Sequence, residues 1–420
     1  MKHKINIADF FRKYMMTIAL VAVTAVFALW PGKEGIILYP ANIHGVIIEN
    51  AYVFVLAAGM LLCILTGGNI DLSVGSVVCF TACIGCTLTS KKGLGTVGAI
   101  CVMLLLGLGI GAFQGFWIAK VRIPPFIVTL AGMYAFRGLS NVVLNGMTER
   151  IEEKTHGAFL KLFGNGKNSN VPDIIREQNP ELAAKFTKSN EALTKLIGEN
   201  YIEKFNLTCM YIGILAVLVF VVIKVFNMRR QRKLGIHYSV VEQIISTIVI
   251  SVVALWVFFK LSCYRGIPYV LIWIALVLGI YAYITNKTAI GRHLYAVGGN
   301  EKATALSGVN TRNVYWFAYA NIGLLAGLAA ILTAARAKGI DSTYGEGYEM
   351  DAIASCFIGG ASAYGGVGSI SGMLIGALLM GVINKGMIII GVASTYQKVV
   401  KGLVLLVAVL FDVLTKRKKH

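Results

Sequence analysis

Long apolar runs alternate with short polar stretches along most of the 420 residues. A bilayer core about 30 Å thick needs roughly 20 apolar residues of helix to cross it, and most of these runs approach that length. The tenth run is too short to span a membrane as a regular helix. The predicted segments are residues 15–30, 46–65, 70–88, 97–119, 126–144, 207–226, 244–259, 269–284, 314–332, 352–360, 370–390 and 399–414.

Basic residues are concentrated in alternate connections between these runs. With the N-terminus inside, the inner loops carry more than twice as many Lys and Arg residues as the short outer loops. The positive-inside rule therefore predicts that both termini lie in the cytoplasm. The pattern as a whole predicts an all-α polytopic membrane protein with about 10–12 transmembrane segments.

One polar stretch divides the chain into three predicted parts. Residues 1–146 hold the N-terminal transmembrane segments, and residues 207–420 hold the C-terminal ones together with an inner loop, 285–313. Residues 147–206, polar and rich in both charges, form an insert that the topology places outside. Apolar residues at roughly helical spacing after Pro180 favour a small helical elaboration, and a flexible loop is the alternative.

Composition excludes a water-soluble multidomain enzyme. The chain is 57% apolar and 14% charged, whereas soluble domains are about 45–50% apolar and about 25% charged. The net charge of +19 arises from basic clusters between apolar runs, not from a basic face with interleaved aromatics, so we expect no nucleic-acid partner. The eight cysteines lie mostly in apolar stretches and are interpreted as small packing residues.

Two glycine-rich stretches, residues 66–76 and 359–369, interrupt the apolar pattern, and both end in Val-Gly-Ser before a long apolar run. Irregular backbone at membrane depth persists only where protein buries it or where it lines a wet cavity. Paired broken segments are typical of internally repeated transporters. Residues 111–115 resemble 376–381 on helices of opposite predicted direction, which allows an inverted repeat. Close helix packing is the alternative for any single glycine.

A few polar side chains fall within the apolar regions. A charge at the bilayer centre costs at least about 2.5–3.5 kcal/mol, so Asp71 and Arg137 should line an interior or satisfy helix ends. Asp351 is interpreted as a cap of the short tenth segment. Neutral amides with few carboxylates favour an uncharged polyhydroxylated solute. The residues predicted to line or brace the pathway are Asn69, Asp71, Ser73, Ser76, Arg137, Asn141, Asn321 and Ser362.

The sequence contains no energy source of its own. It has neither a P-loop nor a carboxylate relay, and no nucleophile–base set indicates an enzyme. Within the inner loop, Asn300 is a good N-cap for a helix over residues 301–307, and Gly308 suits the C′ position. This helix is either a rigid lever for a partner that supplies energy or a simple solvated connector.

Several ordered motifs resemble the ribose/xylose class of bacterial sugar ABC importer permeases, most closely the multiple-monosaccharide and xylose permeases. The resemblance covers about residues 46–145 and 265–413. It rests on residues 70–76, 114–119, 122–132, 136–139, 264–268, 291–301, 351–354, 359–362 and 365–369, and on the extra pair of spans that flank residues 228–231.

The resemblance implies a monosaccharide permease of the bacterial cytoplasmic (inner) membrane that works by alternating access. It implies a homodimer, or a dimer with a related permease, bound to a cytoplasmic ABC ATPase that holds ATP and Mg²⁺, while this chain binds neither cofactor nor metal. A periplasmic or lipid-anchored sugar-binding protein would dock outside, and membrane lipid would surround the spans. The residues implied in ATPase coupling are Gly298, Gly299, Asn300, Glu301, Ala303 and Gly308.

Two departures from the class stand out: Lys385 replaces a neutral polar residue, and the insert 147–206 is long. The alternatives that stay open are a nucleoside importer on the same scaffold, an ion-coupled sugar symporter, and a membrane receptor or scaffold.

Overall fold

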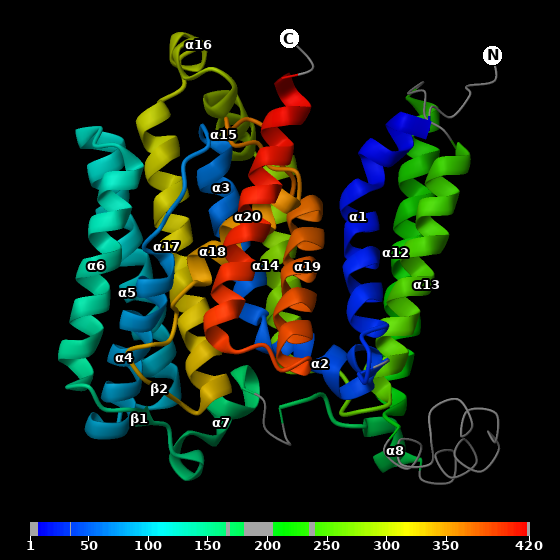
Figure 1. Cartoon of the computed structure of the whole chain (residues 1–420), viewed down its shortest axis with the longest axis horizontal. Coiled ribbons are helices and arrows are strands. Elements are labelled where there is room, and N and C mark those ends of the chain that lie inside the picture. The colour runs from blue at the N-terminus through cyan, green and yellow to red at the C-terminus, as the bar shows by residue number, and fades with distance from the viewer. Residues whose placement is uncertain (1–6, 34, 165–168, 180–204, 235–239, 418–420) are drawn as a thin grey trace. The chain divides into compact units, whose positions relative to one another are not determined.

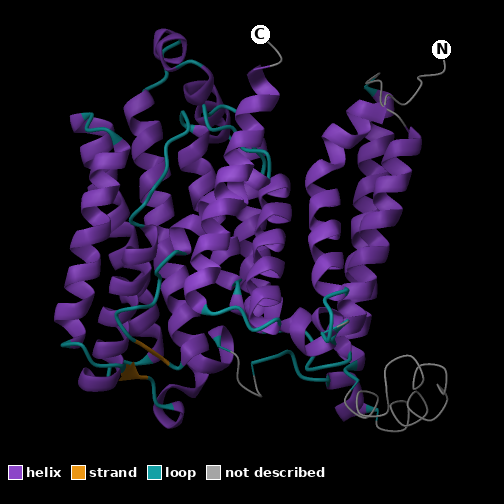
Figure 2. Ribbon diagram, in the orientation of Figure 1, coloured by secondary structure: helices purple, strands orange, loops and turns teal. Residues whose placement is uncertain are grey.

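The computed structural model describes residues 7–33, 35–164, 169–179, 205–234 and 240–417. Helices make up most of this part of the chain (Figure 2). Two compact units are present. The first consists of Met1–Ile37, Val46–Asn165 and Val270–His420, and the second of Leu38–Gly45 and Gly166–Tyr269. The helical run predicted after Pro180 lies outside the described residues.

Each of the twelve predicted apolar segments falls on a helix. The elements are α1 (Ile7–Ala28), η1 (Ile36–Leu38), α2 (Pro40–Glu49), α3 (Ala51–Leu65), α4 (Val74–Lys92), α5 (Thr96–Phe116), η2 (Trp117–Val121), α6 (Pro125–Leu144), β1 (Glu149–Arg150), α7 (Glu153–Phe163), α8 (Ile174–Gln178), α12 (Leu207–Lys233), α13 (Val240–Ser262), α14 (Tyr269–Lys287), α15 (Ala289–Gly299), α16 (Glu301–Leu306), α17 (Thr311–Ala337), β2 (Gly339–Ile340), α18 (Tyr348–Ile358), α19 (Ile370–Ile389) and α20 (Ser394–Arg417).

Eight helices of the described chain are long and apolar enough to cross a membrane: α4, α5 with η2, α6, α12, α13, α14, α17 and α19. The pair α2 and α3, bent by 42°, is a ninth candidate, and Met15–Ala28 within α1 forms a shorter apolar helix. The prediction of an all-α polytopic membrane protein is therefore confirmed. The tenth predicted segment corresponds to α18, whose 11 residues are too few for a regular span. The range of 10–12 spans stays a prediction.

The core of the first unit is built around α3, all of whose residues are buried. It packs against α17, α18 and α19. A further close pair is α5 and α17, where a Cβ on Gly107 or Gly111 would overlap the backbone of α17 at Gly323. Small residues let membrane helices approach until their backbones touch, so here the packing interpretation of single glycines holds.

The start of the predicted insert belongs to this same unit. Strands β1 and β2 pair antiparallel, with Glu149 opposite Ile340 and Arg150 opposite Gly339. Lys91 forms an ion pair with Glu149, and Lys338 forms one with Glu153. The first residues of the insert therefore have a defined fold, while the division at residues 146 and 206 stays a prediction.

The second unit contains α8 and the helix pair α12–α13, which is tightly packed where a Cβ on Gly213 would meet the Phe258 ring. Asp173 accepts the N–H of Arg176 in α8 (3.3 Å) and the N–H groups of Leu207 and Thr208 in α12 (2.9 and 3.1 Å). One carboxylate thus satisfies the first turns of two helices, which otherwise carry unpaired N–H groups.

Candidate functional site

The chain between α3 and α4, residues 66–73, is irregular, and we call it the first break. It leaves α3 close to α15 and follows the bundle to the start of α4 (Figure 1). Asp71 Oδ1 accepts the N–H (2.8 Å) and the hydroxyl (2.6 Å) of Ser73, the residue immediately before α4. Asp71 is only 3% exposed. A negative charge is favoured at a helix N-terminus, so the carboxylate stabilises the start of α4.

Gln114 of α5 completes this contact. Its amide nitrogen lies 2.9 Å and its amide oxygen 3.1 Å from Ser73 Oγ. A Cβ on Gly132 of α6 would overlap the Gln114 amide nitrogen, so a larger residue there would push the amide away from Ser73. The first break is therefore braced by the Gln114 side chain of α5, against which Gly132 of α6 packs.

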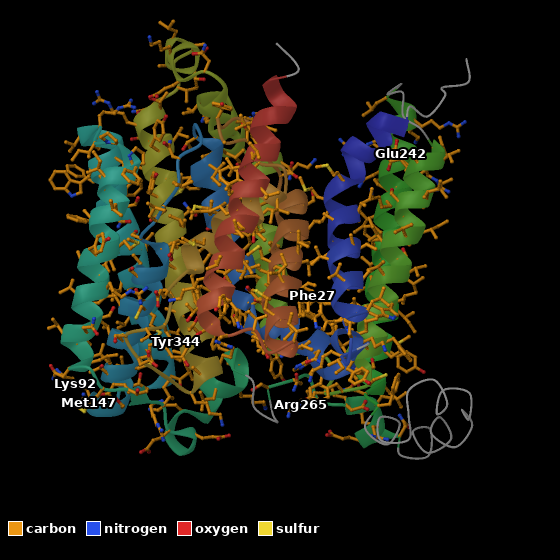
Figure 3. The ribbon with its side chains drawn as sticks, in the orientation of Figure 1. Phe27, Lys92, Met147, Glu242, Arg265 and Tyr344 are labelled. Atoms are coloured by element: carbon orange, nitrogen blue, oxygen red, sulfur yellow. The ribbon has the colours of Figure 1, made fainter. Side chains whose placement is uncertain are left out.

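A turn over residues 341–347, before α18, lies beside the start of α4. Arg137 of α6 donates from Nη1 to the carbonyl oxygens of Ser342 (2.9 Å) and Tyr344 (2.7 Å); Figure 3 labels Tyr344. A Cβ on Gly75 would overlap the carbonyl oxygen of Gly345, so the N-termini of α4 and α18 meet through glycine. Arg137 thus has backbone acceptors for its charge inside the bundle.

Residues 359–369, between α18 and α19, form the second break, which touches the first directly. The N–H of Gly366 donates to the carbonyl of Leu65 at 3.0 Å. A Cβ on Gly68 would overlap the carbonyl of Ala363. Both breaks therefore meet at the end of the first unit where α3 stops and α19 begins.

Helix α15 packs against the place where the two breaks meet. A Cβ on Gly298 would overlap the carbonyl oxygen of Leu65 and the nitrogen of Gly366. The hydroxyl of Tyr295 donates to the carbonyl of Gly368 at 2.9 Å. We call this region, with α15 and α16, the α15–α16 end. Since α5 ends here and α19 begins here, the expected opposite directions of these two helices are confirmed, whereas an inverted repeat stays a prediction.

The predicted short helix of the inner loop is present as α16. Asn300 Oδ1 accepts the N–H of Ala303 at 2.9 Å, and Gly308 follows the helix with a φ of +86°. The capping predictions for both residues are confirmed. Leu306, in the last turn, is 90% exposed. An exposed leucine on a capped surface helix offers apolar area whose burial by a partner would be favourable.

Glu301 faces the body of the unit. Its Oε1 accepts from Arg122 Nη1 (2.7 Å) and Thr311 Oγ1 (3.1 Å), and its Oε2 accepts from the Tyr315 hydroxyl (3.0 Å). Burial acts to raise the pKa of Glu301, but these three hydrogen bonds and the Arg122 charge outweigh burial and lower the pKa below its ordinary value. Glu301 therefore carries its negative charge at neutral pH.

Asp351 corrects the expectation of a helix cap. Its side chain is fully buried, and its Oδ2 accepts from the Tyr52 hydroxyl (2.5 Å), from Lys401 Nζ of α20 (2.8 Å) and, more weakly, from Asn384 Nδ2 (3.4 Å). Asn384 Nδ2 also donates to Asn50 at 2.9 Å. A charge in such surroundings requires a counter-charge, and α20 supplies it.

The predicted pathway residues do not form one cluster. Asn141 is exposed, and Asn321 accepts from the Tyr281 hydroxyl at 2.9 Å. Ser76 Oγ is buried without a hydrogen-bond partner in the described chain. The remaining ones are held locally: Asn69 donates to Thr66 Oγ1 at 3.2 Å, and Ser362 accepts the N–H of Tyr364 at 3.0 Å.

The coupling residues are closer together, since Gly298, Gly299, Asn300, Glu301 and Ala303 lie on or between α15 and α16. A Cβ on Gly299 would meet no atom within 4 Å, in contrast to Gly298. Lys385, the departure from the class, pairs with Glu49 at 2.7 Å.

Sequence reasoning missed Gln114, Arg122, Leu306 and Lys401. Arg122 and Gln114 fell within motifs that were recognised but not interpreted singly. Lys401 had a usable signal, because a lysine in the first turns of an apolar helix near a carboxylate-bearing segment needs a counter-charge. Among the described residues, no group of three or more His, Cys, Asp or Glu side chains could hold a metal ion.

Comparison with known proteins gives one consistent answer. Residues 42–226 and 182–409 match the family described as "Branched-chain amino acid transport system / permease component". The xylose transport system permease protein of Haemophilus influenzae is 30% identical over 406 residues, 96% of this chain and 97% of that protein. That of Escherichia coli is 32% identical over 409 residues, 96% and 92% of the two chains. The ribose import permease of Escherichia coli is 30% identical over 371 residues, 88% and 85%. No solved structure matches this chain.

Proposed function

Because the chain belongs to the family of permease components of branched-chain amino acid transport systems, we propose that it is the membrane subunit of an ABC importer for monosaccharides. The observation that supports this best is the near full-length similarity to xylose and ribose permeases. The substrate class is therefore a pentose or hexose, with xylose the first candidate. Transport proceeds by alternating access in the bacterial inner membrane.

The α15–α16 end is the part of the chain that docks the ATPase. Helix α16 is short, capped at both ends and presents Leu306 almost fully to its surroundings. ABC importers take their energy from a cytoplasmic ATPase, and this sequence has no P-loop of its own. ATP and Mg²⁺ are thus held by the partner, and this chain binds no cofactor. Both termini and α16 lie on the cytoplasmic side.

Two further partners complete the transporter. A second copy of this chain, or a related permease, pairs with it in the lipid, and a periplasmic or lipid-anchored sugar-binding protein docks on the opposite side. The insert 147–206 faces that side and contacts the sugar-binding protein.

The eight predicted pathway residues divide into two roles. Asp71, Ser73 and Arg137 brace the starts of α4 and α18, since each is engaged with neighbouring backbone or side-chain groups. Asn69, Ser76, Asn141, Asn321 and Ser362 line the pathway. In this division a sugar meets neutral hydrogen-bonding groups, and the charged side chains remain occupied by the protein.

The test is reconstitution of the permease with its ATPase and sugar receptor in vesicles, with labelled xylose as the substrate. We expect uptake that requires ATP inside and that is competed by free pentoses or hexoses. Competition by nucleosides alone would favour the nucleoside importer. Accumulation driven by an ion gradient without ATPase would favour the symporter, and absence of any flux would favour a receptor or scaffold.

Leu306→Asp tests the docking surface. Burial of a leucine side chain contributes about 1.5–3 kcal/mol, so ATPase binding should weaken about 30-fold. Met147→Asp is the matched control, because Met147 is also an exposed apolar residue (61%) and lies next to β1, away from α16 (Figure 3). Unchanged ATPase binding by Leu306→Asp would contradict the docking role of α16.

A further inference from the structure

Glu301 lies on the inner side of α16, not on the side that Leu306 presents. Its two carboxylate oxygens accept three hydrogen bonds from groups outside α16, at 2.7 Å from Arg122, 3.1 Å from Thr311 and 3.0 Å from Tyr315. A carboxylate with its oxygens occupied in this way has little capacity left for a partner protein. The contact joins α16 to two other elements of the same chain.

Arg122 is held in an unusual way. It follows the π-helical turn η2 and has a φ of +68°, a left-handed conformation that non-glycine residues rarely adopt. Its guanidinium also donates to Thr311 Oγ1 (3.3 Å) and lies 5.6 Å from the centre of the Tyr315 ring. π-helical turns are frequent at functional sites. The connector between α5 and α6 thus places one cation against the first turns of α17.

Tyr315 links this contact to the first break. Its ring carries the hydroxyl that binds Glu301, and a Cβ on Gly67 would lie 3.9 Å from that hydroxyl oxygen and 3.8 Å from Asn69 Nδ2. The hydroxyl therefore lies between α16 and the polypeptide that leads to Asp71 and α4. Leu306, by contrast, is 90% exposed, and its proposed role in docking does not require a contact with the bundle.

We propose that Arg122 and Tyr315 are positioning residues that hold Glu301 and transmit the displacement of α16 to the first break. This inference rests on the proposed function, since it assumes that an ATPase moves α16. It divides α16 into two faces: Leu306 binds the partner, and Glu301 passes the movement inward. Coupling between sites is carried by such networks of hydrogen bonds and ion pairs between rigid elements.

The experiment uses the full transporter in vesicles, with xylose as the probe, and compares Glu301→Gln, Arg122→Gln, the double variant and Tyr315→Phe. Lys398→Gln is the matched control, because it removes one charge from an exposed ion pair with Glu346, on α20, which this link does not include. Two quantities are measured for each: ATPase binding, and the number of xylose molecules taken up per ATP hydrolysed.

We expect ATPase binding to stay unchanged while uptake per ATP falls about fivefold or more, the lower end of the range for coupling between sites. The double variant should be no worse than either single variant, because both remove the same link. Exchange of the charges, Arg122→Glu with Glu301→Arg, should restore part of the uptake per ATP. Tyr315→Phe removes a single hydroxyl and should fold normally, so it reports on the link if Arg122→Gln does not fold.

Three results would overturn the inference. Loss of ATPase binding in Glu301→Gln would make Glu301 a docking residue. A double variant whose loss is the product of the two single losses would make the residues independent. Equal uptake per ATP in Tyr315→Phe, Glu301→Gln and the control would remove the link altogether. Failure of the unaltered transporter to take up xylose with its ATPase would instead count against the proposed function.

Discussion

The first unit contains one ion pair in its interior and another at its α15–α16 end, and the two differ in how far their side chains are exposed. Asp351 is fully buried and pairs with a lysine whose side chain is 17% exposed, whereas the Glu301 and Arg122 side chains are 36% and 43% exposed. A buried charge that loses its partner is stranded in a low dielectric, while an exposed one is taken over by water. The interior pair therefore fixes α18 to α20, and the surface pair can part and re-form during a transport cycle.

Loss of the interior cation is expected to have the largest effect. Lys401→Met leaves Asp351 unpaired and should cost about 3–5 kcal/mol of stability. Thermal unfolding of the purified protein in detergent measures it. The control on the same helix is Lys398→Met, whose exposed pair with Glu346 should contribute about 0–1 kcal/mol.

The double variant Lys401→Met with Asp351→Asn sharpens this point. It removes both charges, so it should recover part of the stability lost in Lys401→Met. Equal unfolding temperatures for Lys401→Met and Lys398→Met would show that the buried ion pair stabilises the protein no more than an exposed one.

Gly298→Ala tests whether the end depends on backbone contact more than on charge. Its methyl group would overlap the carbonyl of Leu65 and the nitrogen of Gly366, and backbone atoms cannot turn aside as a side chain can. We expect a loss of about 3 kcal/mol, the upper part of the usual cost of overpacking. A Cβ on Gly299 would meet no atom within 4 Å, so Gly299→Ala should have an unfolding temperature close to that of the unaltered protein. A reversed order would show that α15 does not touch the breaks.

Asp71→Ala examines the polar brace at the start of α4. The substitution leaves the buried N–H of Ser73 without its acceptor and removes the shorter of the two bonds that the Ser73 hydroxyl donates, so it should cost about 1–3 kcal/mol. Asp71→Asn keeps an acceptor and loses only the charge near the helix N-terminus, a smaller effect of about 0.3–1 kcal/mol. The unfolding temperatures of the two variants measure this difference. An equal loss of stability in both would mean that only the charge of Asp71 stabilises the start of α4.

The smallest effect concerns pH. The Glu301 pKa lies below its ordinary value of 4.5. A group whose pKa is lower in the folded state contributes stability above its unfolded pKa and loses it as the pH falls through the folded pKa. The difference in unfolding temperature between the unaltered protein and Glu301→Gln should thus be constant from about pH 8 to about pH 5 and shrink as the pH falls below the unfolded pKa of about 4.3.

Because the Arg122–Glu301 pair is more than one-third exposed, that difference should correspond to about 1 kcal/mol or less. A difference that already disappears between about pH 7 and pH 6 would point to a different titrating group.

The positions of the helices could be predicted because lipid imposes a simple rule on the chain. Apolar length alone located the helices that carry the twelve predicted segments, but not α7, α8 or α15. Two local rules, a side-chain cap at Asn300 and a left-handed glycine at Gly308, located α16. These features depend on residues that are near each other in sequence.

The partners of Asp351, Glu301 and Ser73 could not be predicted for the opposite reason. Lys401 and Gln114 come from other helices and Arg122 from a connector, at 50, 41 and 179 residues away in sequence. Apolar length says where a helix begins but not which of its faces meets which neighbour. The interpretation of Asp351 as a cap was wrong because it considered only the local position of a carboxylate in a first turn.

The enclosure of α3 by protein has a consequence for the order in which the molecule is made. Every residue of α3 is covered, and the helices that cover it, α17, α18 and α19, begin only after residue 310. When α3 enters the bilayer, its neighbours have not yet been synthesised. Because its sequence is apolar, α3 can remain in contact with lipid until α17, α18 and α19 are inserted and displace that lipid. Biogenesis of the bundle must therefore finish from the C-terminal third, and a chain that stops at residue 310 would leave its central helix unprotected.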